Sequence, residues 1–241
     1  ADSRRRLGVM ANPAPAQDAQ TALEFGAEGV GLCRTEHMFF QPERLSVMQE
    51  MIVAARLSSV NPEDPEPLGR YEAALKTLEA LQVADFEGMF RAMSGKPVVV
   101  RLLDPPLHEF LPSHDDLLAE VIELRVRGND PALLADRESL LAAVDDLREA
   151  NPMLDLRGCR LGLTYPAIYE MQARAILSAA RGVADEGVDA HPEIMVPLVS
   201  HGNEMARIRK GLEETIASFQ RETGASVACR IGAMIEIPRA A

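Results

Sequence analysis

The chain has 241 residues, 47% of them hydrophobic, and its 25 Lys and Arg against 37 Asp and Glu give a formal net charge of −12. This acidic balance argues against nucleic acid or an anionic membrane as the main partner. No apolar stretch approaches the roughly 20 residues of a membrane-spanning helix, and we expect no signal peptide. The length suits a single barrel domain covering residues 1–241.

Helical spacing of apolar residues alternates along the chain with short strand-like runs. The pattern predicts helices over residues 16–26, 42–57, 70–93, 117–126, 137–149, 166–183 and 203–223, with a loop at 61–69. It predicts about six strands, over residues 7–12, 29–34, 97–103, 193–199 and 227–237, and over the more ambiguous run 157–163. This alternation indicates an α/β fold with a parallel sheet, either a barrel or a doubly wound sheet.

Three of these strands end in charged side chains. Arg34 and Glu36 close the first, Arg101 closes the second and Glu236 closes the last. Because alternate residues of a strand share a face, Arg34, Arg101 and Glu236 would converge at the carboxyl-terminal mouth of a barrel, where barrel enzymes place their chemistry. A charge at the end of a buried strand is costly unless it has a partner or a ligand.

These side chains suit a phosphorylated or carboxylated small molecule bound with magnesium. Arginine grips phosphate or carboxylate oxygens with two donors, and Mg²⁺ often takes only one or two oxygens from protein. A purely structural alternative stays open, in which Arg34 pairs with Glu36, Arg101 pairs with Asp104, and Glu236 satisfies an arginine.

Other candidates carry less information. Arg157 and Arg160 would add a third contact to an anion, or serve only the structure. The segment 200–202, Ser-His-Gly, predicts the N-terminal cap of the last helix. No Walker loop or GxGxxG motif is present, and we expect no nucleotide site in this segment.

The three cysteines, Cys33, Cys159 and Cys229, lie far apart and form no CxxC pair. They support neither a zinc site nor a disulfide framework. We therefore expect buried, unreactive thiols and a cytoplasmic location.

Several segments together resemble the family of phosphoenolpyruvate-utilising enzymes. They are GAEGVGLCRTEHMF at 26–39, NPMLDLRGCR at 151–160, EIMVPL at 193–198 and GAMIEIPRA at 232–240. The stretch RLLDPPLHEFLP at 101–112 is similar to the pyruvate, phosphate dikinase branch of that family in particular. The phosphoenolpyruvate synthase branch and a non-catalytic barrel that only binds remain as alternatives.

The resemblance implies a (β/α)8 TIM-type barrel that binds phosphoenolpyruvate and pyruvate. In this family a swivelling domain carries a phosphohistidine between the barrel and a nucleotide-binding domain, and the parent is a homodimer. By motif position, Arg34 and Arg101 would hold the transferring phosphoryl group, Arg157 would assist, and Glu236 would bind Mg²⁺. Magnesium and the arginines would neutralise the charge that develops during the transfer.

The chain departs from the family pattern at Asp155, where the family usually has glycine. This acid either pairs with Arg157 and weakens its contact with phosphate, or points outward. By the same resemblance, the second magnesium aspartate and the catalytic cysteine are expected downstream of Ala241, and the phosphohistidine and the ATP site upstream of Ala1. We therefore expect an incomplete barrel that holds no catalytic residue and is inactive alone.

Overall fold

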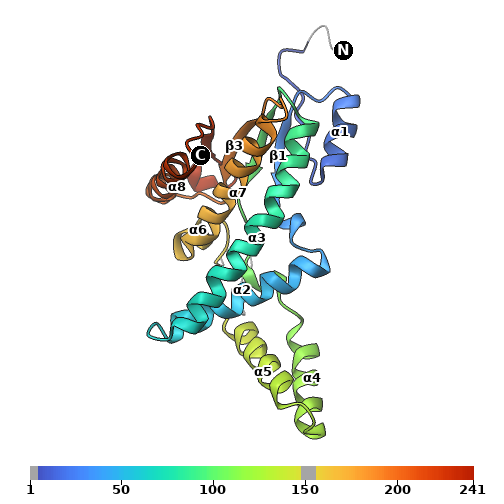
Figure 1. The fold of residues 1–241 in the computed structure, drawn as a ribbon, viewed down its shortest axis with the longest axis vertical. Helices are drawn as coiled ribbons and strands as arrows, with labels where there is room; N and C mark the ends of the chain where they lie inside the picture. Colours follow the sequence, from blue (N-terminus) through green and yellow to red (C-terminus); the bar gives the residue numbers. More distant parts are fainter. Residues whose placement is uncertain (1–4, 148–155) are drawn as a thin grey trace. The chain divides into compact units, whose positions relative to one another are not determined.

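The computed structural model describes residues 5–147 and 156–241. Short 3-10 helices are labelled η. In chain order, the elements are α1 (Ala16–Glu24), β1 (Val30–Arg34), η2 (Thr35–Met38), α2 (Pro42–Val60), α3 (Pro65–Ala92), β2 (Pro97–Arg101), η3 (Leu107–Phe110), α4 (His114–Arg127), α5 (Pro131–Asp146), α6 (Cys159–Thr164), α7 (Pro166–Ala184), β3 (His191–Val196), α8 (Gly202–Thr223), β4 (Arg230–Ala233) and η4 (Pro238–Ala240) (Figure 1).

Within the described residues, the strands form one parallel sheet in the order β1-β2-β3-β4. The α/β prediction is therefore confirmed. Neighbouring strands in this sheet are also neighbours along the chain. A barrel has this sequential order, whereas a doubly wound sheet reverses its order at a switch point. The sheet topology thus favours the barrel over the doubly wound alternative.

Two of the predicted strands, 7–12 and 157–163, do not form strands in the structure. In the run 7–12, Ala11 alone forms a β-bridge, to Val30, among the residues described. Leu7, Val9 and Met10 are exposed, so this segment buries no face that would fix it as a full strand. The run 157–163 is not a strand but largely belongs to helix α6, for reasons that concern the site and are given below.

The predicted helices agree with the structure apart from their ends and two starts. Helix α5 begins at Pro131, before the start that we predicted at residue 137. Helix α3 begins at Pro65, inside the segment that we predicted as a loop. Proline is tolerated in the first turn of a helix, where its missing N–H would have no partner inside the helix anyway. The predicted cap of α8 is confirmed, since the His201 side chain accepts a hydrogen bond from the N–H of Asn203 at 3.1 Å.

The described chain divides into two compact units, and each has its own apolar interior. The first comprises residues up to Phe39, Leu78–Asp104 and Arg157–Ala241, and contains the sheet. Its interior is formed by the inner strands β2 and β3 and by the buried face of α7. The expectation of a single domain over 1–241 stays a prediction.

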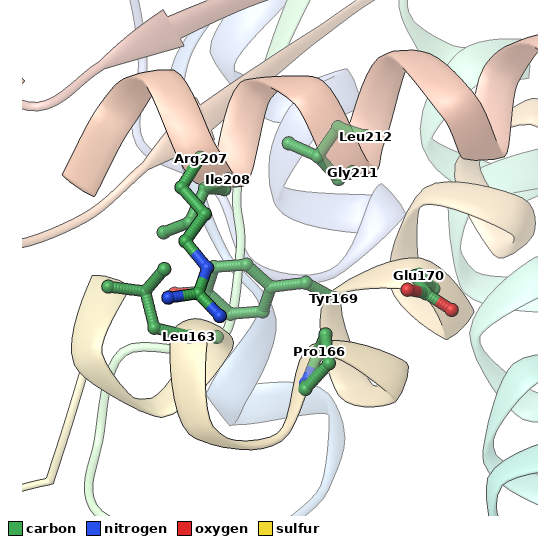
Figure 2. A pocket seen from close by; sticks show the side chains of 9 residues that line it. Leu163, Pro166, Tyr169, Glu170, Arg207, Ile208, Gly211 and Leu212 are labelled. Carbon is green, nitrogen blue, oxygen red and sulfur yellow. The ribbon is translucent and has the colours of Figure 1, made fainter. Parts of the chain in front are cut away.

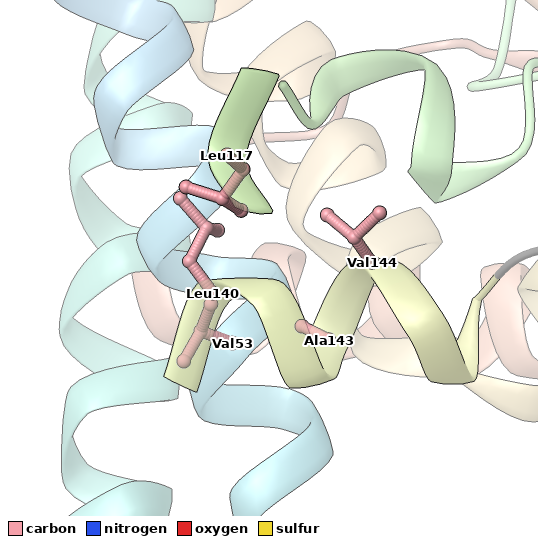
Figure 3. Packing of buried hydrophobic residues seen from close by; sticks show 5 residues of the cluster. All are labelled: Val53, Leu117, Leu140, Ala143 and Val144. Atoms are coloured by element: carbon pink, nitrogen blue, oxygen red, sulfur yellow. The ribbon is translucent and has the colours of Figure 1, made fainter. Parts of the chain in front are cut away.

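The second unit comprises Phe40–Thr77 and Pro105–Leu156. Here α4 and α5 pack against each other, and α2 packs against α5. Figure 3 shows the cluster of buried side chains at this junction, which consists of Val53, Leu117, Leu140, Ala143 and Val144.

Candidate functional site

Arg34 and Arg101 stand opposite each other in the sheet. They are the last residues of β1 and β2, and the pairing register matches one with the other. Parallel neighbours lie about 4.8 Å apart, so the two strand ends present their guanidinium groups from the same edge. Their surroundings differ, because Arg34 is exposed whereas Arg101 is only 7% exposed.

Arg101 is held on two sides by buried carboxylates. Its Nη2 contacts Oε1 of Glu36, and its Nη1 lies 3.0 Å from Oδ2 of Asp104. Glu36 is 5% exposed and Asp104 is 3% exposed. The backbone of Arg101 is fixed as well, since the hydroxyl of Thr35 donates to its carbonyl oxygen at 3.0 Å. A charge so far from water requires partners of this kind.

Asp104 also reaches the third predicted arginine. Arg157 Nη2 donates to the same Oδ2 atom at 2.7 Å, so one carboxylate oxygen joins two guanidinium groups. Four buried polar atoms of this cluster have no hydrogen-bond partner within the described residues: Glu36 Oε2, Arg101 Nε, Arg157 Nε and Asp104 Oδ1. The two Nε donors among them are therefore available to an anionic ligand.

The loop after β2 is anchored from α7. The N–H of Leu103 donates to Gln172 Oε1 at 2.7 Å, and the buried hydroxyl of Tyr169 donates to the Leu103 carbonyl at 3.0 Å. The pKa of Tyr169 is raised well above its ordinary value, mainly because the side chain is buried. The hydroxyl therefore stays protonated and remains a donor. Asp104, the next residue, therefore projects from a fixed backbone.

Arg157 is positioned by a tight turn at Gly158, which explains why residues 157–163 are not a strand. Gly158 has a φ of +55°, and its N–H donates to the Asp104 carbonyl at 2.8 Å. The N–H of Cys159 then donates to the Pro197 carbonyl at 3.0 Å, and helix α6 starts there. These backbone bonds outweigh the alternating pattern that predicted a strand.

Glu236 lies beyond the end of β4 and is exposed. Its Oε1 accepts a hydrogen bond from the N–H of Leu198 at 2.8 Å. Leu198 has a φ of 58°, which is unusual for a bulky residue and costs roughly 1 kcal/mol or more. Backbone strain of this sort concentrates at functional sites.

The four predicted site residues are therefore only partly brought together. Arg34 shares a register position with Arg101, and Asp104 links Arg101 to Arg157. Glu236 makes no direct contact with these arginines in the described part of the chain. Met234, two residues before Glu236, does contact one of the arginines, since its Sδ lies 4.0 Å from Arg101 Nη1.

The structural alternative is right for one pair and wrong for another. Arg101 does pair with Asp104, as that alternative expected. Glu36, however, pairs with Arg101 and not with Arg34, for which the described residues offer no ion pair. Asp155, the departure from the family pattern, lies outside the described residues.

Sequence reasoning missed the role of Gly158 and Leu198. The only signal in the sequence was the glycine directly after Arg157, where a turn with positive φ is possible.

The cysteines that approach this site are buried thiols. Cys33 and Cys159 are free and buried, as predicted, whereas Cys229 is free and only partly buried, so the prediction is wrong for its burial. Burial raises the pKa of Cys33 to about 12, assisted by the negative charge of Glu36. Burial likewise raises the pKa of Cys159 to about 11, assisted by Glu204. Both thiols therefore stay protonated and unreactive near neutral pH.

A separate pocket lies between α6, α7 and α8, in the sheet-bearing unit. Figure 2 shows Leu163, Pro166 and Tyr169 on one wall and Ile208 and Leu212 of α8 on the other. Arg207 and Glu170 add charges at its edge. The predicted site residues do not line this pocket, so it is distinct from the arginine cluster.

Two features that would bear on function are absent from residues 5–147 and 156–241. Neither a helix capable of crossing a membrane nor a group of three or more His, Cys, Asp and Glu side chains arranged for a metal ion is found there.

The fold and site together define an α/β protein whose parallel sheet carries arginines at the carboxyl ends of adjacent strands, an arrangement suited to a small anion. The model of the PEP-utilising enzyme, PEP-binding domain family matches residues 1–241, and the chain belongs to this family.

The chain is 48% identical to the pyruvate, phosphate dikinase of Rhizobium meliloti (strain 1021) over 242 positions, which cover 100% of the chain and 25% of that relative. It is also 48% identical to the chloroplastic pyruvate, phosphate dikinase of Flaveria trinervia, covering 100% of the chain and 24% of that relative. The identity to the Entamoeba histolytica pyruvate, phosphate dikinase is 44%, over 100% of the chain and 26% of that relative. The chain thus spans about a quarter of the length of these curated relatives.

Proposed function

We propose that this chain is the part of a pyruvate, phosphate dikinase that binds phosphoenolpyruvate and pyruvate. The parent enzyme would transfer a phosphoryl group between a phosphohistidine and pyruvate in a magnesium-dependent reaction. Membership of the PEP-binding family and identities of 44% to 48% to proteins of that name support this assignment.

One observation carries the proposal: exposed Arg34 stands in register with buried Arg101 at the carboxyl edge of the sheet. In a purely structural arrangement both arginines would be matched by carboxylates. Glu36 and Asp104 both serve Arg101, and Arg34 keeps an unmatched positive charge among the described residues. An anion is the ligand that this unmatched charge would attract.

In the proposed roles, Arg34, Arg101 and Arg157 contact the phosphoryl oxygens. Fixed positive charges stabilise a phosphoryl transfer because negative charge is spread over these oxygens in the transition state. Arg101 is already desolvated and clamped, so it needs little reorganisation when the ligand arrives. Arg34 is solvated and free to close over the ligand.

Magnesium is the proposed cofactor, with Glu236 as its ligand from this chain. The residue fits the ion, because a carboxylate oxygen is a hard donor and Mg²⁺ often takes only one or two protein carboxylates. The Leu198 N–H donates to Oε1 of Glu236, and no hydrogen bond to Oε2 is found within the described residues. When bound, the ion would supply further charge neutralisation at the phosphoryl oxygens.

Several features of the parent belong to the same proposal. They are the swivelling phosphohistidine domain, the homodimer, the cytoplasmic location, a barrel domain over residues 1–241, and the inactivity of this chain alone. A phosphoenolpyruvate synthase is the nearest rival. Formation of diphosphate from phosphate in the full-length protein would favour the dikinase over that synthase.

Substitution of Arg34 by alanine tests the proposal most cleanly, because this side chain is exposed and has no described ion pair whose loss would disturb folding. We expect Arg34→Ala to raise the Kd for phosphoenolpyruvate, with Mg²⁺ present, by about tenfold or more, as for loss of a charge-assisted contact. Isothermal titration calorimetry on the full-length protein measures this change.

Arg181→Ala is the matched control, since Arg181 is also exposed but lies in the last turn of α7, which leads to the amino ends of the strands. The affinity of the Arg181→Ala variant for phosphoenolpyruvate should equal that of the unaltered protein. Equal affinities for Arg34→Ala and Arg181→Ala would contradict the proposed site.

A further inference from the structure

We propose that Asp104 is a positioning residue that joins Arg101 and Arg157 into one anion-binding pair. The inference rests on the proposed function, because it concerns the same site. Neither the family resemblance nor the sequence pattern assigned Asp104 more than a local salt bridge with Arg101.

The geometry of a single oxygen atom carries the inference. Asp104 Oδ2 lies 3.0 Å from Arg101 Nη1 and 2.7 Å from Arg157 Nη2. The two guanidinium groups come from distant segments of the chain, since Arg157 lies 53 residues after Asp104. Like charges at this spacing repel each other, so the shared carboxylate is what allows them to stay close.

Burial makes this link firm. The side chains of Asp104 and Arg101 are 5% and 8% exposed, and that of Arg157 is 20% exposed. Water therefore screens these contacts much less than it screens a surface ion pair. The cluster also has donors that a bound anion could use, because Nε of Arg101 and Nε of Arg157 are buried with no acceptor among the described residues.

Glu36 provides an internal comparison. It contacts Arg101 from the β1 side but has no contact with Arg157 in the described structure. Its second oxygen, Oε2, has no hydrogen-bond partner within the described residues. Loss of the Glu36 charge should loosen Arg101 alone, whereas loss of the Asp104 charge should release Arg157 as well. The two carboxylates thus differ in whether they couple the arginines.

A double-mutant cycle in the full-length protein tests this coupling. We expect Asp104→Asn and Arg157→Ala each to raise the Kd for phosphoenolpyruvate with Mg²⁺ by about tenfold. The double variant should be no more than about threefold weaker than either single one, because Arg157 contributes only while Asp104 holds it. Glu36→Gln combined with Arg157→Ala should instead give multiplied losses.

Multiplied losses for Asp104→Asn with Arg157→Ala would overturn the proposal, as would an unchanged Kd for Asp104→Asn alone. Glu222→Gln, which removes the exposed partner of Arg174, is the control and should leave the Kd unchanged. Failure of the proposed function is distinguishable: in that case Arg34→Ala, which leaves Asp104 intact, would also bind phosphoenolpyruvate normally.

Chemical rescue decides the matter if the Asp104 variant does not fold. In Arg157→Ala, the carboxylate of Asp104 still faces the position that the Arg157 guanidinium occupied. Millimolar guanidinium chloride, too dilute to denature, should restore most of the lost affinity for phosphoenolpyruvate. Absence of any recovery would contradict a carboxylate that holds the second cation, while the same addition to Arg181→Ala should change nothing.

Discussion

At the scale of single residues, the two strand-end arginines occupy equivalent positions in the sheet but have different surroundings. Arg34 and Arg101 share a register, yet one is exposed and the other is clamped by Glu36 and Asp104. The sequence predicts that charges gather at this edge, because strand ends are visible in the pattern. It does not predict which charge is buried, because that depends on Thr35, Glu36 and the loop after β2.

Gly158 is a residue whose conformation and close contacts both exclude a side chain. With a φ of +55° and a ψ of −132°, its backbone lies in a region used almost only by glycine, and an L-residue there would be strained by about 1–3 kcal/mol. An added Cβ would lie 2.6 Å from Leu198 Cβ and 3.2 Å from Asp104 Oδ1. We expect Gly158→Ala to lower the free energy of unfolding by about 2–4 kcal/mol, measured by urea denaturation.

Gly224→Ala is the comparison at an uncrowded glycine with positive φ. Gly224 also has a positive φ, +68°, but its ψ of 1° places it in the left-handed helical region, and nothing lies within 4 Å of an added Cβ. Its substitution should cost only the strain, about 1–2 kcal/mol. Equal losses at both glycines would show that the contacts of Gly158 with Leu198 and Asp104 have no energetic consequence.

At the scale of elements, the sequence predicted long helices well and the short segment 157–163 wrongly. Helices such as α7 and α8 repeat their apolar positions over many turns, which identifies them locally. Residues 159–164 are too few for such a repeat, and Cys159, Leu161 and Leu163 alternate as in a strand. Their helix is decided by hydrogen bonds to Asp104 and Pro197, which are distant in sequence.

Helix α8 begins with a carboxylate that accepts several hydrogen bonds. Glu204 Oε2 accepts from Ser200 N and Ser200 Oγ, both at 2.9 Å, and from His201 N at 3.0 Å. Burial raises the pKa of Glu204, but the hydrogen bonds from Ser200, His201 and Cys159 together lower it. The lowered pKa means that the charged form is the one favoured by folding.

The stability contributed by Glu204 should therefore depend on pH. It is fully present above the unfolded value of about 4.3 and is lost as the pH falls through the lower folded value. We expect Glu204→Gln to cost about 1 kcal/mol at pH 7, as for loss of a helix cap, with the difference shrinking below about pH 4. Urea denaturation across this pH range measures it.

Glu213→Gln is the control on the same helix. Glu213 forms an exposed pair with Arg209, one turn away, and should contribute less than about 0.5 kcal/mol at any pH. A cost for Glu204→Gln that stays constant down to pH 3 would contradict the assigned role of its charge.

At the scale of the whole molecule, the α/β class followed from the alternation of strands and helices, whereas the division into two units did not. The sheet-bearing unit and the helical unit are each assembled from separate segments of the chain. Helices α4 and α5 have the same apolar spacing as helices that cover a sheet, so local patterns do not assign them to a different interior. Only contacts between distant segments show that Leu140 belongs with Val53 and Leu117.

Separate interiors predict separate responses to a cavity. Leu140→Ala should cost about 2–5 kcal/mol, because it removes buried methyl groups from the cluster with Val53 and Leu117. Hydrogen exchange should then accelerate in α4 and α5, while the amides of β2 and β3 keep their protection, since local opening follows compact units. Leu118→Ala, on the exposed side of α4, is the control and should change exchange little. Equal loss of protection in β2 and β3 would mean that the two interiors open as one.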